Sequence, residues 1–115
     1  MTKPTIKHLV IGGGGPTGLM LFGLLRELAE KEFWNPDKIE SIYATSFGAI
    51  IAVCISLGYS WTDLEDYLVK RPWHKLVDFN LRGCVNAIYT KGLVSGDFCR
   101  QAISPLLTAR DFDQD

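Results

Sequence analysis

A single serine, Ser46, stands where an apolar, β-favouring run ends and an apolar helical run begins. At a sharp strand-to-helix turn, a serine is pushed out of the sheet and its hydroxyl is exposed. The N-terminus of the following helix lies behind it and presents unpaired N–H groups and a partial positive charge, which favour negative charge developing nearby. The stretch 42–50 therefore predicts a nucleophilic serine on an elbow, and a buried serine at a helix start is the alternative.

The residues on either side of Ser46 follow most of the pattern that such an elbow needs. The usual arrangement is Gly-x-Ser-x-Gly, because small residues two before and two after the serine let strand and helix approach closely. Gly48 holds the second small position, and Ala44 replaces the first glycine. We expect Ala44 to crowd the turn modestly.

A second candidate for chemistry is the glycine-rich run at 12–18, which also follows an apolar run. Its pattern Gly13-x-Gly15-x-x-Gly18 matches the fingerprint of Rossmann-type FAD- and NAD-binding modules. That fingerprint also requires an acid at the end of the second strand, to hold the ribose hydroxyls. The second predicted strand ends at 43–46 without an acid, and Glu40 lies near its start. We therefore expect no flavin or nicotinamide cofactor, although the dinucleotide-binding module stays open as the alternative.

An acyl-transfer site would use the serine turn and the glycine turn together. A serine ester hydrolase needs N–H donors aimed at the oxyanion of its tetrahedral intermediate, and a glycine-rich turn after a neighbouring strand can supply them. In a parallel sheet both turns would lie at the carboxyl ends of the strands, where such sites form. The two motifs together therefore favour acyl transfer more than either motif does alone.

Strands and helices alternate along the chain, which is typical of an α/β fold with a parallel sheet. In chain order, we expect a strand at 8–11, a helix from about 16, a strand at 39–43, a helix at 47–57, a helix capped by Ser60 and a last helix from about 96. The unbroken apolar run at 8–11 suits a strand buried on both faces. Pro105 should end or kink the last helix. Two strands make a poor core, so the chain looks like part of a longer domain.

The composition excludes several other classes of protein. The net charge of −1 gives no basic excess, so we expect no nucleic acid partner. Three widely spaced cysteines at positions 54, 84 and 99 fit neither a disulfide framework nor a CxxC metal site, so we expect no metal. The run 47–57 is shorter than the roughly 20 residues that span a bilayer. The start of the chain lacks the apolar core of a signal peptide, and we expect a cytoplasmic protein.

Three stretches together resemble the patatin-like phospholipases. They are the glycine run with its flanking residues at 9–19, the elbow at 44–50, and Lys-Gly-Leu-Val-Ser-Gly-Asp at 91–97. The resemblance implies a three-layer α/β/α fold with a mainly parallel sheet. It also implies a lipid acyl hydrolase, similar to phospholipase A or lysophospholipase, that uses a Ser–Asp dyad on a phospholipid acyl ester and makes peripheral contact with membranes.

Carried over residue by residue, the resemblance makes Ser46 the nucleophile and Gly13, Gly14 and Gly15 the oxyanion loop. The family's Arg or Lys in the glycine loop is Thr17 here. The family's catalytic aspartate belongs to a later Asp-Gly-Gly or Asp-Gly-Ala motif, and residues 1–115 contain none. We therefore expect residues 1–115 to be the N-terminal part of a single patatin-like domain, with the catalytic Asp outside this chain. A catalytically inactive relative that only binds lipid is a further alternative.

Other acids and histidines could be proposed as the base. We expect none of them to act as the base: His8 begins a strand, Asp97 falls in the first turn of a helix, His74 lies in a stretch without an assigned element, and Asp78 and Asp111 read as surface residues.

Overall fold

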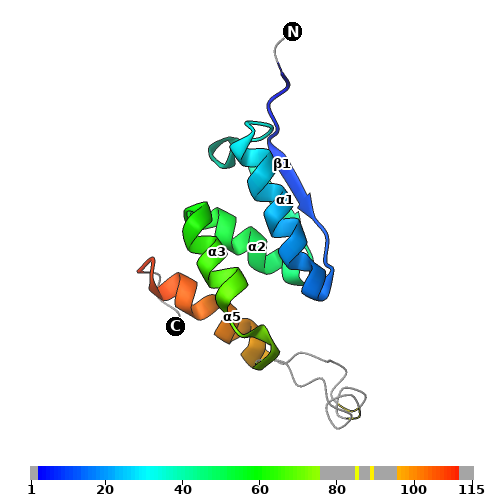
Figure 1. Cartoon of the computed structure of the whole chain (residues 1–115), viewed down its shortest axis with the longest axis vertical. Coiled ribbons are helices and arrows are strands. Elements are labelled where there is room, and N and C mark those ends of the chain that lie inside the picture. Colours follow the sequence, from blue (N-terminus) through cyan, green and yellow to red (C-terminus); the bar gives the residue numbers. More distant parts are fainter. Residues whose placement is uncertain (1–2, 76–84, 86–88, 90–95, 112–115) are drawn as a thin grey trace. The chain divides into compact units, whose positions relative to one another are not determined.

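The computed structural model describes residues 3–75, 85, 89 and 96–111. The chain forms two compact units, Met1–Val69 and Lys70–Asp115. The first unit contains both strands and both motifs singled out above (Figure 1).

The first unit is built on a parallel pair of strands, as the sequence predicts. Strand β1 (His8–Ile11) pairs with β2 (Ser41–Ala44), and the register places Val10 beside Tyr43 and Ile11 beside Ala44. The second strand therefore begins and ends slightly later than the predicted range 39–43. Because the strands are parallel, the segments that follow Ile11 and Ala44 emerge at the same edge of the sheet.

The two faces of this small sheet differ in burial. Ile11 is only 2% exposed, whereas Val10 is 83% exposed and its neighbour Tyr43 is 65% exposed. The prediction of a strand buried on both faces is therefore wrong for this structure. The physical reason is that α2 (Phe47–Ser56) packs on the sheet, while within the described residues Val10 and Tyr43 stay open to solvent.

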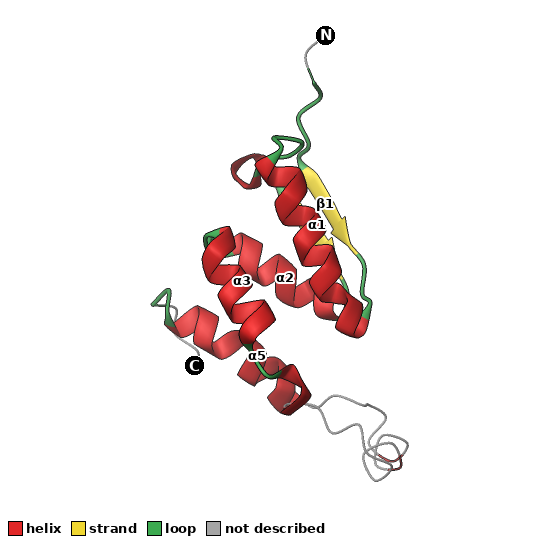
Figure 2. Cartoon of the chain, viewed as in Figure 1, coloured by secondary structure: helices red, strands yellow, loops and turns green. Residues whose placement is uncertain are grey.

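The crossover between the strands begins with a short 3₁₀ turn, η1 (Gly15–Thr17), and continues as helix α1 (Gly18–Glu30). The predicted start near residue 16 is confirmed to within two residues. Phe22 and Leu25 are buried on one side of α1. A second 3₁₀ turn, η2 (Pro36–Lys38), leads into β2. Figure 2 labels helix α1 in red and strand β1 in yellow.

Helix α2 is the most apolar helix of the unit, and its residues Ile50, Ile51, Cys54 and Ile55 are buried. It ends close to the predicted boundary, and Gly58 follows with φ +69°. That left-handed conformation favours glycine after a helix.

Helix α3 (Trp61–Lys70) begins with the predicted serine cap. Ser60 Oγ accepts a hydrogen bond from the Asp63 N–H at 3.1 Å and donates one to Asp63 Oδ2 at 2.7 Å. Arg26 of α1 forms ion pairs with Glu30 and with Glu65 of α3, so it links the two helices. No helix within the described parts of the chain is long and apolar enough to cross a membrane.

The second unit contains the 3₁₀ turn η3 (Trp73–Lys75) and helix α5 (Gly96–Thr108). Of the two expected effects of Pro105, ending or kinking the last helix, the first does not occur, because Pro105 lies inside α5, which continues to Thr108. A proline cannot donate to the carbonyl four residues earlier, here that of Gln101. Arg71 Nη2 donates to the Gln101 carbonyl at 2.6 Å, which satisfies the group that Pro105 leaves unpaired.

Candidate active site

Ser46 occupies the sharp turn that the sequence predicts. It directly follows Thr45, the residue after β2, and it precedes the first residue of α2. Its backbone has φ 55° and ψ −134°, a conformation that is rare for a residue with a side chain and costs of order 1–3 kcal/mol. The side chain is exposed. A strained, exposed serine between a strand and a helix is the local geometry of a nucleophile elbow.

The glycine two residues after Ser46 lets α2 approach β1. A Cβ atom on Gly48 would lie 2.7 Å from the Gly12 carbonyl oxygen and 2.9 Å from the Ile11 carbonyl oxygen. Backbone oxygens cannot move aside as a flexible side chain can, so this position requires glycine. The other small position is filled by Ala44, which ends β2 and is half-buried.

The glycine loop borders the serine, as expected for two turns at one edge of a parallel sheet. A Cβ atom on Gly13 would lie 2.7 Å from Ser46 Cβ and 3.4 Å from Ser46 Oγ. The backbone of Gly13 thus runs directly beside the serine side chain. Gly15 has φ +54°, so the next turn of the loop also depends on glycine.

Two threonine hydroxyls hold the loop in place. The Gly13 N–H donates to Thr45 Oγ1 at 3.1 Å. The Gly14 carbonyl accepts from Thr17 Oγ1 at 2.7 Å and from the Thr17 N–H at 3.1 Å. Thr17, which stands where the resemblance expects Arg or Lys, therefore anchors the loop through neutral hydrogen bonds. These anchoring roles were not predicted from the sequence, where hydroxyls next to a glycine run are the only signal for them.

The start of α1 is packed closely against the start of α2. A Cβ atom on Gly18 would overlap the ring of Phe47. Gly18 therefore permits the contact that brings the end of the glycine loop next to the residue that follows Ser46.

Several polar groups around Ser46 stay open for a ligand or another protein segment. Within the described residues, the Ser46 hydroxyl has no hydrogen-bond partner, and the N–H groups of Gly14 and Gly15 donate to none. The N-terminus of α2 begins at the adjacent residue, and its partial positive charge favours an anion there. The arrangement can present a hydroxyl together with nearby amide donors.

The residues considered as a base do not pair with Ser46 where the structure describes them. His8 Nδ1 lies 2.8 Å from Ser41 Oγ, at the other end of the strands. Asp97 lies in the first turn of α5, as predicted, and Asp111 is exposed. Asp78 and the side chain of His74 lie outside the described residues, as do Cys84 and residues 91–95 of the third resembling stretch.

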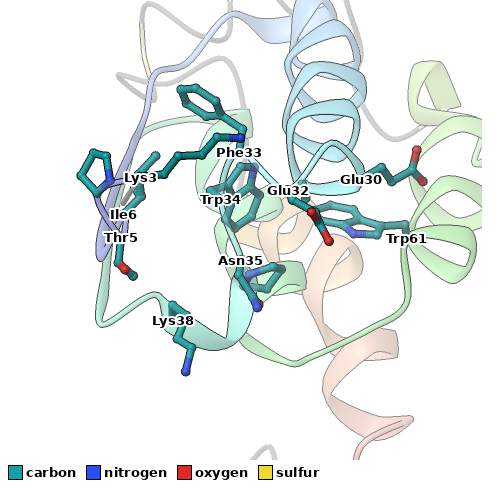
Figure 3. A pocket seen from close by; sticks show the side chains of 13 residues that line it. Lys3, Thr5, Ile6, Glu30, Glu32, Phe33, Trp34, Asn35, Lys38 and Trp61 are labelled. Atoms are coloured by element: carbon teal, nitrogen blue, oxygen red, sulfur yellow. The ribbon is translucent and has the colours of Figure 1, made fainter. Parts of the chain in front are cut away.

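A pocket of about 540 Å³ lies at the opposite edge of the sheet (Figure 3). It is lined by the segment before β1, the end of α1, the connection before β2 and the first residue of α3, and Ser46 is not among its lining residues. Its walls include Lys3, Ile6, Phe33, Trp34, Lys38 and Trp61. Trp34 is fixed there by its indole N–H, which donates to the Leu25 carbonyl at 3.0 Å.

The environment of Cys54 does not favour thiol chemistry. Cys54 is buried in α2, and this burial raises the pKa of its thiol from 9.0 to about 12. A neutral, buried thiol is inert near pH 7. Among the described residues, no three His, Cys, Asp or Glu side chains form a group that could hold a metal ion.

Comparison with known proteins gives a match to one protein family and to longer relatives. The profile of the family described as Patatin-like phospholipase matches residues 9–115. An uncharacterized protein of Bacillus subtilis, YqhO, is 31% identical over 108 residues, which covers 88% of this chain and 36% of that protein. An uncharacterized protein of Acanthamoeba polyphaga mimivirus, R571, is 35% identical over 77 residues, which covers 67% of this chain and 26% of that protein. The chain thus spans about a quarter to a third of these relatives. No solved structure matches significantly.

Proposed function

Because the chain belongs to the patatin-like phospholipase family, we propose that the protein containing it hydrolyses acyl ester bonds of lipids with Ser46 as the nucleophile. The observation that carries this proposal is the backbone of Ser46, which combines φ 55° with ψ −134° at the junction of β2 and α2. Strain of this kind persists only where the surrounding fold imposes it, and it is characteristic of functional residues.

The proposed reaction proceeds through an acyl-enzyme. Ser46 Oγ attacks the acyl carbonyl carbon while its proton passes to a base, and a tetrahedral oxyanion forms. The carbon–oxygen bond to the lipid alcohol then breaks, and that alcohol leaves with the proton from the base. A water molecule attacks the acyl-enzyme in the same way and releases the fatty acid and the free serine.

We propose the glycine loop as the oxyanion hole. Gly13 runs beside Ser46, and the N–H groups of Gly14 and Gly15 have no acceptor among the described residues. Backbone N–H groups fixed before the reaction stabilise an oxyanion without reorganising as charge develops.

We propose that the base is an aspartate outside this chain, and that residues 1–115 form the N-terminal part of one larger domain. Three observations support this. The relatives are about three to four times longer than the matched segment. The Ser46 hydroxyl has no partner among the described residues, and Val10 and Tyr43 leave one sheet face exposed.

We further propose that the substrate is a phospholipid or lysophospholipid and that the protein acts at a membrane surface from the cytoplasm. Met20, in the first turn of α1 and close in sequence to the glycine loop, is 76% exposed. We propose that this exposed apolar side chain contacts the acyl chains of the substrate.

The test of this function is hydrolysis of phosphatidylcholine and lysophosphatidylcholine by the intact protein that contains this chain. Ser46→Ala should abolish fatty-acid release. Ser56→Ala is the matched control, because Ser56 is an exposed serine at the end of α2, the helix that follows Ser46, and its hydroxyl donates to the Ala52 carbonyl at 2.8 Å. Equal loss of fatty-acid release in both variants, or fatty-acid release that survives Ser46→Ala, would contradict the proposal. Lipid binding without any turnover by the wild-type protein would indicate an inactive relative.

A further inference from the structure

Thr45 connects the two turns of the candidate site. It lies between the last residue of β2 and Ser46, and its N–H donates to the Ile11 carbonyl at 3.2 Å. Its backbone is thus held by the end of β1. Its side-chain oxygen reaches in the same direction and accepts the Gly13 N–H at 3.1 Å. One residue therefore bonds both the strand and the loop that follows that strand.

The hydrogen bond to Thr45 divides the amides of the glycine loop into two groups. The Gly13 N–H is used within the protein, whereas those of Gly14 and Gly15 donate to no described residue. The Gly14 carbonyl is held by Thr17 on the other side. Consequently the loop is held on one side by the Gly13 N–H and on the other by the Gly14 carbonyl. The N–H groups of Gly14 and Gly15 therefore keep one orientation.

We propose that Thr45 is a positioning residue, whose hydroxyl holds the Gly13 N–H so that the amides of Gly14 and Gly15, rather than Gly13, serve the oxyanion. This inference rests on the proposed hydrolase function. Thr45 itself does not touch the reacting atoms in this scheme. It acts by keeping the loop against Ser46, and small errors in the placement of catalytic groups reduce rates strongly.

The hydroxyl can be removed with little change of shape. Thr45→Val keeps the branched side chain and removes the acceptor, whereas Thr45→Ser keeps the acceptor and removes a methyl group. Thr62→Val is the matched control, because Thr62 is an exposed threonine on α3. All three variants and Ser46→Ala are compared in the intact protein with a soluble short-chain ester and with a trifluoromethyl ketone, which forms a tetrahedral adduct with a reactive serine.

For Thr45→Val we expect kcat to fall by about 10²-fold with little change in KM, and the inhibition constant of the ketone to rise by a similar factor. In Thr45→Ser, kcat and the inhibition constant should both stay close to the wild-type values. Thr62→Val should match the wild type. A purely structural defect would lower the fraction of active protein and hence kcat, but it would leave the inhibition constant of the remaining active sites unchanged.

Two outcomes separate the failure of this inference from the failure of the proposed function. If Ser46→Ala is inactive while Thr45→Val keeps the wild-type kcat and inhibition constant, the positioning role is wrong and the hydrolase function stands. If Ser46→Ala keeps full turnover, the proposed function fails, and the role of Thr45 fails with it.

Discussion

Gly48 lies so close to Gly12 that a Cβ atom on Gly48 would be 2.7 Å from the Gly12 carbonyl oxygen. This contact joins the first turn of α2 to the segment after β1. It therefore sets how near the elbow comes to the glycine loop, and it makes the separation of the two motifs sensitive to a single methyl group.

Gly48→Ala should destabilise the fold and disturb the elbow. Forcing a methyl group into a packed site typically costs about 1–3 kcal/mol. Gly23→Ala is the control, because Gly23 lies within α1 and a Cβ there would meet no atom within 4 Å apart from the backbone of its own helix. That variant should gain roughly 0.5–1 kcal/mol, since alanine is favoured over glycine inside a helix. Urea unfolding measures the free energy of unfolding of both variants and of the wild type. A Gly48→Ala variant as stable as Gly23→Ala would contradict the close contact at Gly48.

Gly14→Val should impair catalysis in the intact protein. A Cβ at position 14 would lie 2.5 Å from Thr17 Oγ1, so the side chain would displace the hydroxyl that holds the Gly14 carbonyl. Loss of one oxyanion donor typically lowers kcat by about 10²–10³-fold. Gly12→Ala serves as the comparison, because a Cβ there meets no atom within 4 Å. Unchanged kcat for a short-chain ester in Gly14→Val would exclude this loop as the oxyanion hole.

Cys54 and Cys99 should differ in reactivity towards iodoacetamide at pH 8. Burial raises the pKa of the Cys54 thiol from 9.0 to about 12, whereas Cys99 is exposed. The native protein should therefore be alkylated at Cys99 and protected at Cys54, and both should react in denaturant. Peptide mass spectrometry measures this, and rapid native labelling of Cys54 would show that α2 is not packed as described.

The same burial makes the stability depend on alkaline pH. In the unfolded chain Cys54 ionises near its ordinary pKa of 9.0, whereas in the folded chain it stays neutral up to about 12. The contribution of Cys54 to stability is thus fully present below pH 9 and is lost as the pH rises towards 12. Cys54→Ala should weaken this alkaline loss of stability, as measured by urea unfolding between pH 8 and pH 11.

Local features of the fold were predictable from neighbouring residue types. Ser60 with Asp63 marked a helix start, Gly58 marked a helix end, and an apolar run on each side of Ser46 marked the strand–turn–helix junction. Each of these signals depends on residues within one turn of each other, so no knowledge of the distant chain was needed.

Features that depend on distant residues were not predictable in the same way. The run at 8–11 is apolar throughout, and it gives no sign that Val10 faces solvent while Ile11 is covered. The hydrogen bond from the Gly13 N–H to Thr45 joins residues that are 32 positions apart. Similarly, the continuation of α5 past Pro105 depends on Arg71, which supplies a donor to the Gln101 carbonyl from outside the helix.

Ser46 is proposed as the nucleophile, and fluorophosphonate labelling followed by peptide mass spectrometry tests this role most directly. A serine hydroxyl needs an adjacent base to react readily, and the base is proposed to lie outside this chain. We therefore expect one phosphonyl adduct, on Ser46, in the intact protein, with no adduct in Ser46→Ala and none on residues 1–115 expressed alone. An adduct on another serine, or an intact, folded protein that turns over lipid esters without labelling at Ser46, would contradict the account.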